Sequence, residues 1–415
     1  MGAIIGVGLS LVPLVVVQQI SEGMIAGITE RFVELGTYHL QAVSRYPLSS
    51  EEIDREVERL AILPGVVSAA AERQGFALLY SDAGRSGVTV RAVDAPFWRD
   101  DAALHRLVTV THGEFDLSAE EQIVIGVAVA ESLQVGPGDT VRMLTVRSLG
   151  SGRYLPRISR FVVSGVISTG YRDLDRLWTF VELDRGRTVL SDESSRDIIG
   201  IKIDDPFALP SPLFNRGIRR IQNREAMDRA LQVEEDAARV LSPEWFISDW
   251  YNLERSRYIS FQTTRNLLVF IMIMILVVAA INISSSLIML VLEKETEIAI
   301  LRAAGTPRGV IVGAFIWSGL TVGLAGTALG SAVGIFLSVY INEILRLVES
   351  ILRFFGGRGE LFSADFYLES IPVTVDLLPL ALSAGIALTV SLLSSLIPAL
   401  RAAGIRPERI LRRHA

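Results

Sequence analysis

The amino-acid sequence predicts an α-helical membrane protein with four transmembrane helices and a large α/β extracytoplasmic domain inserted between helices 1 and 2. Half of its 415 residues are hydrophobic, and the mean hydropathy of +0.41 is too high for an ordinary water-soluble protein. Four runs with little or no charge approach or exceed the length needed to cross a hydrocarbon core of about 30 Å. Residues 36–248, by contrast, carry charges throughout and alternate helical with β-type patterns.

Residues 1–35 are predicted to form transmembrane helix 1 and its extension. Residues 3–20 contain no charge, and apolar residues continue at helical spacing from Met24 to Leu35. The run begins almost at Met1, with no basic segment before it and no small-residue cleavage site after it. A cleaved signal peptide is the alternative. We favour a membrane helix whose cytoplasmic lead-in is very short or has been lost from this chain.

Residues 36–248 are predicted to form the extracytoplasmic α/β domain. Ser49 or Ser50 caps a helix that runs to Leu60, and the segment 118–121 resembles a capping box. Strands at 140–147 and 158–167 flank a glycine-rich segment, which predicts a protruding hairpin at 148–157. Exposed tips of this kind either bind a partner or are merely solvated, and both interpretations stay open.

Residues 249–292 are predicted to form one long helix that combines a stalk with transmembrane helix 2. Trp250 begins a stretch of 43 residues without Gly or Pro, which would reach about 64 Å. Its last 26 residues, 267–292, contain no charge. About half of the helix must therefore stand outside the bilayer.

A short charged helix follows at 293–309, closed by Gly305, with Thr306 as the N-cap and Pro307 as the first residue of the next helix. The chain therefore turns sharply and returns to the membrane. A polar helix between two spans is suited to contact with an external motor.

The remaining segments complete the four-span pattern. Transmembrane helix 3 is predicted at 310–341, an extracytoplasmic polar loop at 342–376, helix 4 at 377–400 and a tail at 401–415. In helix 3, the spacing of Gly319 and Gly323, and of Gly326, Gly330 and Gly334, predicts that small residues line one face and let another helix approach closely. The alternative is that glycine is simply commoner in membrane helices. Five arginines among the fifteen tail residues indicate a cytoplasmic C-terminus, which puts the large domain outside.

The motifs of common enzymes are missing from the sequence. It contains no G-x-x-x-x-G-K-[ST] loop, no cysteine and no histidine pair at ligand spacing, so we expect neither nucleotide hydrolysis by that route nor a metal site. The net charge of −6 argues against nucleic acid as a partner.

Several stretches resemble the lipoprotein-releasing permease subunits of bacterial ABC systems, within the FtsX/MacB-like superfamily. They are residues 125–133 (IGVAVAESL), 161–171 (FVVSGVISTGY), 281–289 (INISSSLIM), 293–308 (EKETEIAILRAAGTPR), 367–376 (YLESIPVTVD) and 398–407 (PALRAAGIRP). The helix after the second span is shared by the whole superfamily, whereas the segment 367–376 is similar to the lipoprotein-releasing branch in particular.

The resemblance implies a permease dimer in the bacterial inner membrane, of identical or paralogous copies, which extracts acylated lipoproteins for a periplasmic carrier. Cytoplasmic ABC ATPase subunits would bind ATP and Mg²⁺, and this chain would need no cofactor of its own. Withdrawing acyl chains costs about 0.8 kcal/mol per CH₂, so an external motor is required.

The same resemblance assigns residues to three surfaces. The ATPase-coupling residues would be Glu293, Lys294, Glu297, Leu301, Arg302, Gly305 and Thr306. The carrier-binding hairpin would present Gly152, Arg153, Tyr154, Leu155 and Pro156. A lipid cavity would include Val12, Val15, Met274 and Val278, for which ordinary lipid contact or helix packing is the alternative.

Two other functions are compatible with the four-span pattern. One is a mechanotransmitting exporter subunit of the macrolide-exporter type, and the other is a regulator of cell-wall hydrolases like the cell-division permeases.

Overall fold

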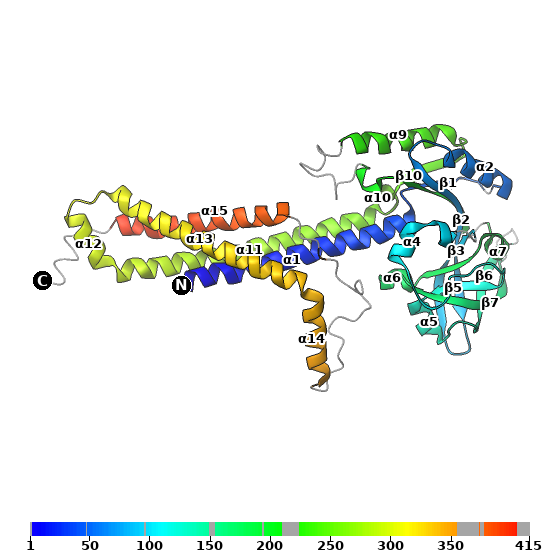
Figure 1. Ribbon diagram of the computed structural model, residues 1–415, viewed down its shortest axis with the longest axis horizontal. Helices are drawn as coiled ribbons and strands as arrows, with labels where there is room; N and C mark the ends of the chain where they lie inside the picture. The colour runs from blue at the N-terminus through cyan, green and yellow to red at the C-terminus, as the bar shows by residue number, and fades with distance from the viewer. Residues whose placement is uncertain are drawn as a thin grey trace. The chain divides into compact units, whose positions relative to one another are not determined.

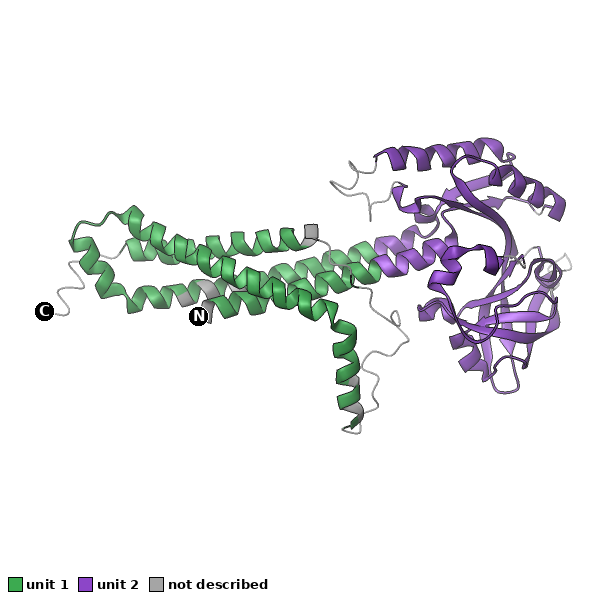
Figure 2. Cartoon of the chain, viewed as in Figure 1, with its two compact units in different colours: residues 1–25, 261–359, 371–415 green, residues 26–260, 360–370 purple. Residues whose placement is uncertain are grey.

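The chain forms two compact units, which Figure 2 distinguishes by colour. The computed structural model describes residues 2–46, 48–94, 97–148, 154–192, 195–209, 224–354, 373 and 377–404. Unit 1 comprises residues 1–25, 261–359 and 371–415, and unit 2 comprises residues 26–260 and 360–370. Helices α1 (Gly2–Arg31) and α11 (Arg255–Glu293) contribute residues to both units.

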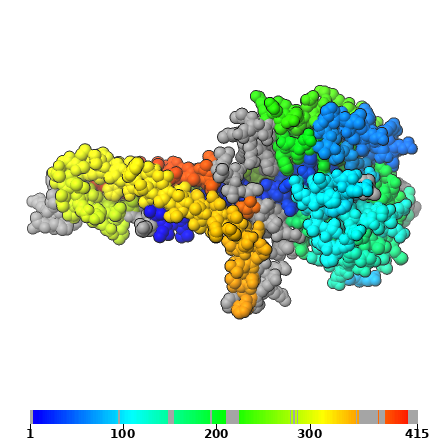
Figure 3. Space-filling model, viewed as in Figure 1, coloured from blue at the N-terminus to red at the C-terminus, as the bar shows by residue number. Residues whose placement is uncertain are grey.

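Unit 1 is helical, and four of the described helices are long and apolar enough to cross a membrane, as predicted. Besides α1 and α11, the helices of unit 1 are α12 Glu295–Ala303, α13 Arg308–Val339, α14 Ile341–Phe354 and α15 Leu377–Ala403 (Figure 1). The four apolar helices are α1, α11, α13 and α15. Their surface carries large exposed apolar side chains such as Phe270, Val278 and Leu400, each more than half exposed. Part of the surface of this unit is visible in Figure 3. Such a surface is stable in lipid but not in water.

The glycines of helix α13 allow close helix packing, as their spacing predicts, but they face two neighbouring helices rather than one. Added Cβ atoms on Gly319 and Gly323 would lie 2.5 and 2.8 Å from atoms of Ser395 and Ser391 in α15, and those on Gly326, Gly330 and Gly334 would lie 2.6 to 2.7 Å from atoms of Val7, Gly8 and Val15 in α1. No side chain fits into such contacts, so glycine is what allows these backbones to approach.

The predicted single helix from Trp250 is wrong in one respect. A short helix α10 (Trp250–Leu253) ends at Glu254, whose dihedral angles of φ −113° and ψ 29° are not helical, and α11 begins at Arg255. Asp249 caps α10 by accepting from the backbone N–H of Asn252. From Arg255 the 39 residues of α11 are continuous and extend about 58 Å. The break therefore precedes the apolar run at 267–292.

The interval predicted as a polar loop at 342–376 contains a helix. Helix α14 follows α13 after the single residue Tyr340, and its apolar and polar residues fall on opposite sides. The loop interpretation was wrong because the charged positions of α14 recur at helical spacing rather than in a run. The segment 367–372 and the tail from residue 405 lie outside the described residues.

Unit 2 is an α/β unit with ten strands among its described residues. The strands are β1 Leu40–Ser44, β2 Val66–Tyr80, β3 Arg85–Val93, β4 Thr109–Gly113, β5 Gln122–Gly126, β6 Thr140–Ser148, β7 Tyr154–Ser168, β8 Trp178–Glu182, β9 Ser195–Ile203 and β10 Trp245–Asp249. The helices are η1 Phe32–Thr37, α2 Ser50–Ala61, α3 Phe97–Asp100, α4 Ala102–Leu107, α5 Val127–Leu133, α6 Arg172–Asp175, α7 Leu183–Val189, η2 Pro206–Ala208, α9 Arg224–Val240 and α10. In chain order all ten strands follow α1 and precede α11.

Six strands of unit 2 close into a ring. Strand β2 pairs with β3, β3 with β8, β8 with β5, β5 with β7, β7 with β6, and β6 again with β2. The β3–β8 and β5–β7 pairs are parallel and the others are antiparallel. Phe161 and Phe180 are among its fully buried side chains. A barrel of only six strands is narrow enough for side chains to fill its interior.

Strand β2 also joins the barrel to a second part of the sheet. Its residues 66–75 pair with β9, and from Leu78 the strand pairs with β6 of the barrel. Strands β1 and β10 extend the sheet beyond β9, with α2 and α9 packed nearby (Figure 1). Ser49 caps α2, which confirms one of the two predicted caps, and it does so in a capping box with Glu52.

The predicted capping box at 118–121 is wrong, because no helix begins there. Asp116 instead organises a turn before β5 by accepting hydrogen bonds from the N–H of Ser118 (3.0 Å) and from Nε2 of Gln122 (2.9 Å). Side-chain acceptors that bond a backbone two residues ahead are typical of turns as well as of helix starts.

Candidate functional site

Helix α12 has one side packed against other helices and one exposed side with charged and apolar residues. Ile298 and Ala299 are buried, and Ile298 packs with Val291, Ile311 and Ala402 from three other helices. Nη1 of Arg302 donates to the backbone oxygen of Ala403 in α15 (2.6 Å). The attachment of one side to α11, α13 and α15 means that a force on α12 is passed directly to three apolar helices.

Four residues predicted for ATPase contact lie exposed on the outer side of α12 or in the two positions directly before it. Glu293, Lys294, Glu297 and Leu301 are exposed, and Lys294 forms an ion pair with Glu297 at 2.6 Å. The hydrogen bond and the negative charge of Glu297 raise the pKa of Lys294 above its usual value. Leu301 is 54% exposed, as is its neighbour Ile300, which sequence reasoning missed. Exposed apolar side chains on a polar helix are suited to insertion into a partner surface.

The turn after α12 has a defined geometry. Gly305 takes a positive φ of 97°, its N–H bonds to Arg302, and the N–H of Thr306 bonds to Leu301. This is the glycine-terminated helix end that the sequence predicts. The N-cap of α13 is Pro307 rather than Thr306. This turn ends α12 and reverses the chain into α13.

The predicted hairpin is confirmed where it is described. Strands β6 and β7 pair antiparallel, with Ser148 opposite Tyr154 and Arg147 opposite Leu155. Gly152 and Arg153 lie outside the described residues, as does the rest of 149–153. The base is attached to a neighbouring segment, because Ser191 Oγ donates to the carbonyl of Val146 (2.9 Å).

One face of the hairpin is apolar and exposed. Val146 lies opposite Pro156, and Leu144 lies opposite Ile158, so the four side chains share a face. Val146 is 47% exposed, Ile158 62% exposed and Pro156 also exposed. Leu155, 53% exposed, points to the other face. Sequence reasoning missed Val146 and Ile158, although their alternation with charged residues is visible in the sequence.

The four residues predicted for a lipid cavity are not brought together by the structure. Val15 is buried and packs with Leu11 and Leu14 in a cluster that includes residues of α11 and α15. Val12 is half-buried, whereas Met274 and Val278 of α11 are 46% and 59% exposed. Val15 thus has a packing role, and Met274 and Val278 lie on an exposed face of α11.

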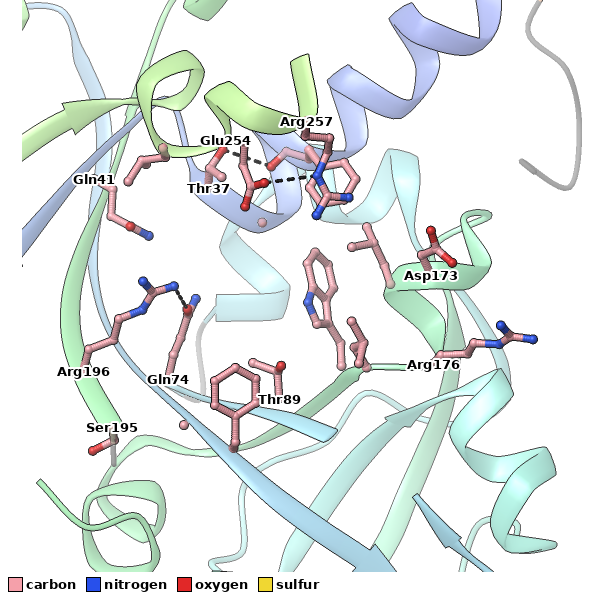
Figure 4. A pocket seen from close by; sticks show the side chains of 18 residues that line it. Thr37, Gln41, Gln74, Thr89, Asp173, Arg176, Ser195, Arg196, Glu254 and Arg257 are labelled. Atoms are coloured by element: carbon pink, nitrogen blue, oxygen red, sulfur yellow. Dashed lines mark hydrogen bonds and ion pairs between the residues drawn. The ribbon is translucent and has the colours of Figure 1, made fainter. Parts of the chain in front are cut away.

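Unit 2 holds a cavity of about 880 Å³ that sequence reasoning did not identify (Figure 4). Trp178, Phe76, Leu177 and Phe32 supply apolar surface. Several polar side chains line the rest, and they are Thr37, Gln41, Gln74, Thr89, Asp173, Arg176, Ser195, Arg196, Glu254 and Arg257. They come from segments far apart in sequence, which explains why no local pattern revealed them.

The charged groups of this cavity are paired with neighbours. Arg257 donates from Nε to Glu254 (3.1 Å), and its guanidinium lies 3.9 Å from the centre of the Phe32 ring. Arg196 donates to Oε1 of Gln74 (3.0 Å) (Figure 4). The cation over an aromatic face fastens the start of α11 to η1.

A buried ion pair links η1 to the barrel. Arg91 of β3 and Glu72 of β2 are almost fully buried and form two hydrogen bonds of 2.6 Å. The hydroxyl of Tyr38 donates to Glu72 at 2.5 Å, and Arg91 also donates to the backbone oxygen of Leu35. Burial alone would lower the pKa of Arg91, but Glu72 raises it overall. Burial and the same carboxylate raise the pKa of Tyr38.

Among the described residues, no group of three or more His, Cys, Asp or Glu side chains is arranged to hold a metal ion.

Comparison with known families assigns the class. Residues 1–208 match the MacB-like periplasmic core domain, and residues 269–407 match the FtsX-like permease C-terminal region. The chain belongs to the FtsX/MacB-like permease family, which confirms the resemblance identified from the sequence motifs.

Within this family, the chain is similar to transmembrane proteins of lipoprotein-releasing systems. The lipoprotein-releasing system transmembrane protein LolC of Xylella fastidiosa is 25% identical over 417 residues, which cover 99% of this chain and 93% of that protein. LolE of Haemophilus influenzae is 26% identical over 298 residues, covering 71% and 65%. Among solved structures, the periplasmic region of MacB from Actinobacillus actinomycetemcomitans aligns with 53% of this chain and 92% of its own, at 11% identity and a TM-score of 0.29.

Proposed function

We propose that this chain is the permease subunit of an ABC transporter that extracts acylated lipoproteins from the outer leaflet of the inner membrane and passes them to a periplasmic carrier. The observation that carries the proposal is the similarity to LolC over 99% of the chain. Four apolar helices and an α/β unit agree with this family.

The proposed topology puts the α/β unit in the periplasm, between transmembrane helices 1 and 2, and α12 in the cytoplasm. It is supported by the order of the elements along the chain and by the arginines of the tail. Helix α12 would then sit where a cytoplasmic ATPase can reach it. ATP and Mg²⁺ would be bound by that partner.

The ATPase contact is proposed for the coupling surface, which is formed by the outer side of α12 and the two residues before it, Glu293 and Lys294. Glu293, Lys294 and Glu297 offer charges of both signs, and Ile300 and Leu301 offer apolar anchors. A partner that binds this surface and changes shape would move α11, α13 and α15, because the inner side of α12 is packed between them.

The carrier contact is proposed for the hairpin of β6 and β7. A carrier of acyl chains must itself expose apolar surface when empty, and the face of Val146, Pro156 and Ile158 would bind such a surface. The paired strands keep this face rigid, which reduces the entropy lost on binding.

The acyl chains are proposed to travel along the exposed face of α11 that includes Met274 and Val278, facing a second permease copy or paralogue. Val12 would border this path, whereas Val15 would support it from inside the helix bundle.

The test is reconstitution of this chain with its ATPase and a second permease in proteoliposomes that contain a labelled lipoprotein. ATP and a soluble carrier should together release the label into the soluble fraction. Failure of release with an active ATPase would exclude the proposal. Export of a soluble periplasmic substrate instead would favour the exporter-type alternative, and activation of a cell-wall hydrolase would favour the regulatory one.

Three matched variants separate the surfaces. Leu301→Glu should abolish ATPase binding but leave carrier binding intact, because a charge enters the apolar part of the coupling surface. Ile158→Glu should abolish carrier binding but leave ATPase binding intact, because the charge enters the apolar face of the hairpin. Ile62→Glu, at an 82% exposed apolar position outside both surfaces, should release lipoprotein at the wild-type rate. Equal effects of all three variants would contradict the assignment of separate surfaces.

A further inference from the structure

Helix α14 has an apolar face that the rest of the described chain does not cover. Over Ile341–Phe354 the apolar residues occupy one half of the helix circumference and the polar residues the other. On the apolar side Leu347 is 61% exposed, Ile351 48% and Phe354 87%. On the polar side Glu343 and Arg346 form an exposed ion pair at 3.3 Å. An apolar face of this size is not stable in water.

The position of α14 in the chain determines what can cover that face. Only Tyr340 separates it from α13, whose 32 residues extend about 48 Å, slightly more than a bilayer with its headgroups. From Gly309 to Ile341 the sequence contains no charge. The end of α13 opposite α12 must therefore emerge at the headgroup layer, and α14 begins there.

The junction has the composition of a membrane interface. Phe336 on the last turn of α13 and Tyr340 directly after it are both about half exposed, and their ring centroids lie 4.8 Å apart. Aromatic rings gather at the boundary between acyl chains and headgroups. Helix α14 then turns away from the axis of α13, as Figure 1 shows, so that it does not continue across the bilayer.

We propose that α14 binds the lipid surface as an interfacial helix, with its apolar face at the acyl boundary and its polar face toward water, in the leaflet opposite α12. Equal numbers of acidic and basic residues in α14 leave it without net charge. The binding is therefore driven by the apolar face and does not depend on anionic lipid or low salt. This contact goes beyond the proposed function and is independent of the ATPase, the carrier and the lipoprotein.

The chain contains no cysteine, so a single introduced cysteine can carry an environment-sensitive fluorophore without background. The variants are Leu347→Cys and Ile351→Cys on the apolar face and Ser350→Cys on the exposed polar face. The full-length protein is reconstituted into phosphatidylcholine vesicles, with and without brominated acyl chains, and exposed separately to iodide.

Brominated lipid should quench the fluorophore at positions 347 and 351 at least about threefold more than at position 350, and iodide should show the opposite order, at low and high salt alike. Quenching by iodide alone at all three positions would overturn the proposal. Protection of positions 347 and 351 from both quenchers would overturn it too, because a protein surface, such as a second copy of this chain, would then cover the face. Circular dichroism of each variant checks that the helices are retained.

Discussion

The two units of the molecule hold their helices and strands together by opposite kinds of contact. In unit 1 the helices approach closely because glycine has no side chain, as at Gly319 against Ser395 and at Gly330 against Gly8. In unit 2 a central contact is made by two charges, Arg91 and Glu72, buried among aromatic rings. Since lipid supplies no hydrophobic force between helices, unit 1 depends on shape. Unit 2 has an apolar core and can accommodate a costly ion pair that fixes one geometry.

This difference predicts where each unit is most sensitive. Unit 2 should fail when one partner of a charge pair is removed, and unit 1 should fail when a small side chain is added. The hypotheses below test that contrast, beginning with the largest expected effect.

Arg91→Met should lower the free energy of unfolding by about 3–5 kcal/mol, because it leaves Glu72 charged and buried without its cation. Trp178, whose ring centroid lies 4.7 Å from the Arg91 guanidinium, provides a nearby fluorescent reporter for denaturant unfolding of the full chain in detergent. The double variant Arg91→Met with Glu72→Gln removes both charges and keeps a polar partner for Tyr38. It should recover most of the loss, and a double variant less stable than the single one would contradict the account.

Gly330→Ala should cost about 1–3 kcal/mol, because the new Cβ would lie 2.7 Å from the backbone oxygen of Gly8 and push α1 away from α13. Gly313→Ala is the matched control on the same helix, since no atom lies within 4 Å of its added Cβ. The control should be neutral or slightly stabilising. Thermal unfolding in one detergent compares the pair, and equal melting temperatures would refute close packing as the source of stability in unit 1.

Asp116→Ala should cost least, about 0.5–1.5 kcal/mol at neutral pH, through loss of the turn before β5. The hydrogen bond from the Ser118 backbone, followed by those from the side chains of Ser118 and Gln122, lowers the pKa of Asp116. A carboxyl with a lowered pKa stabilises the fold above its unfolded pKa of about 3.9 and loses that contribution as the pH falls through its folded value. Wild type and variant should therefore converge in acid, and a difference that persists at the lowest pH would exclude this carboxylate as the cause.

The contrast between the units also explains how much could be predicted from the sequence. The apolar helices and the glycine spacing of α13 are local features, because charge-free length and spacing within one helix reveal them. That these glycines face two different helices depends on the packing. The β6–β7 hairpin is local too, since its two strands are adjacent in the chain. Helix α14 was available from its spacing but was overlooked within a longer polar interval.

The organisation of unit 2 depends on contacts that no local pattern reports. Closure of the barrel requires β2 to meet β6, more than 60 residues later, through only three paired residues. Arg91 and Glu72 lie in strands whose charges look solvated in the sequence, and only the pairing of β2 with β3 brings them together. The cavity beside Trp178 is likewise assembled from separate elements. For the surface proposed to contact the ATPase, the sequence predicted the exposed charges of Glu293, Lys294 and Glu297 but missed the exposed apolar side chain of Ile300.

The central claim is that this chain handles the acyl chains of lipoproteins for a motor on another polypeptide. A lipoprotein with a photoactivatable group in its acyl chains, reconstituted with the complex, tests it most directly. The account predicts cross-links to peptides of α1 and α11 before ATP is added, and their loss once ATP and a soluble carrier are present. Cross-linking no stronger than that of a phospholipid with the same photoactivatable group, and unchanged by ATP, would contradict it.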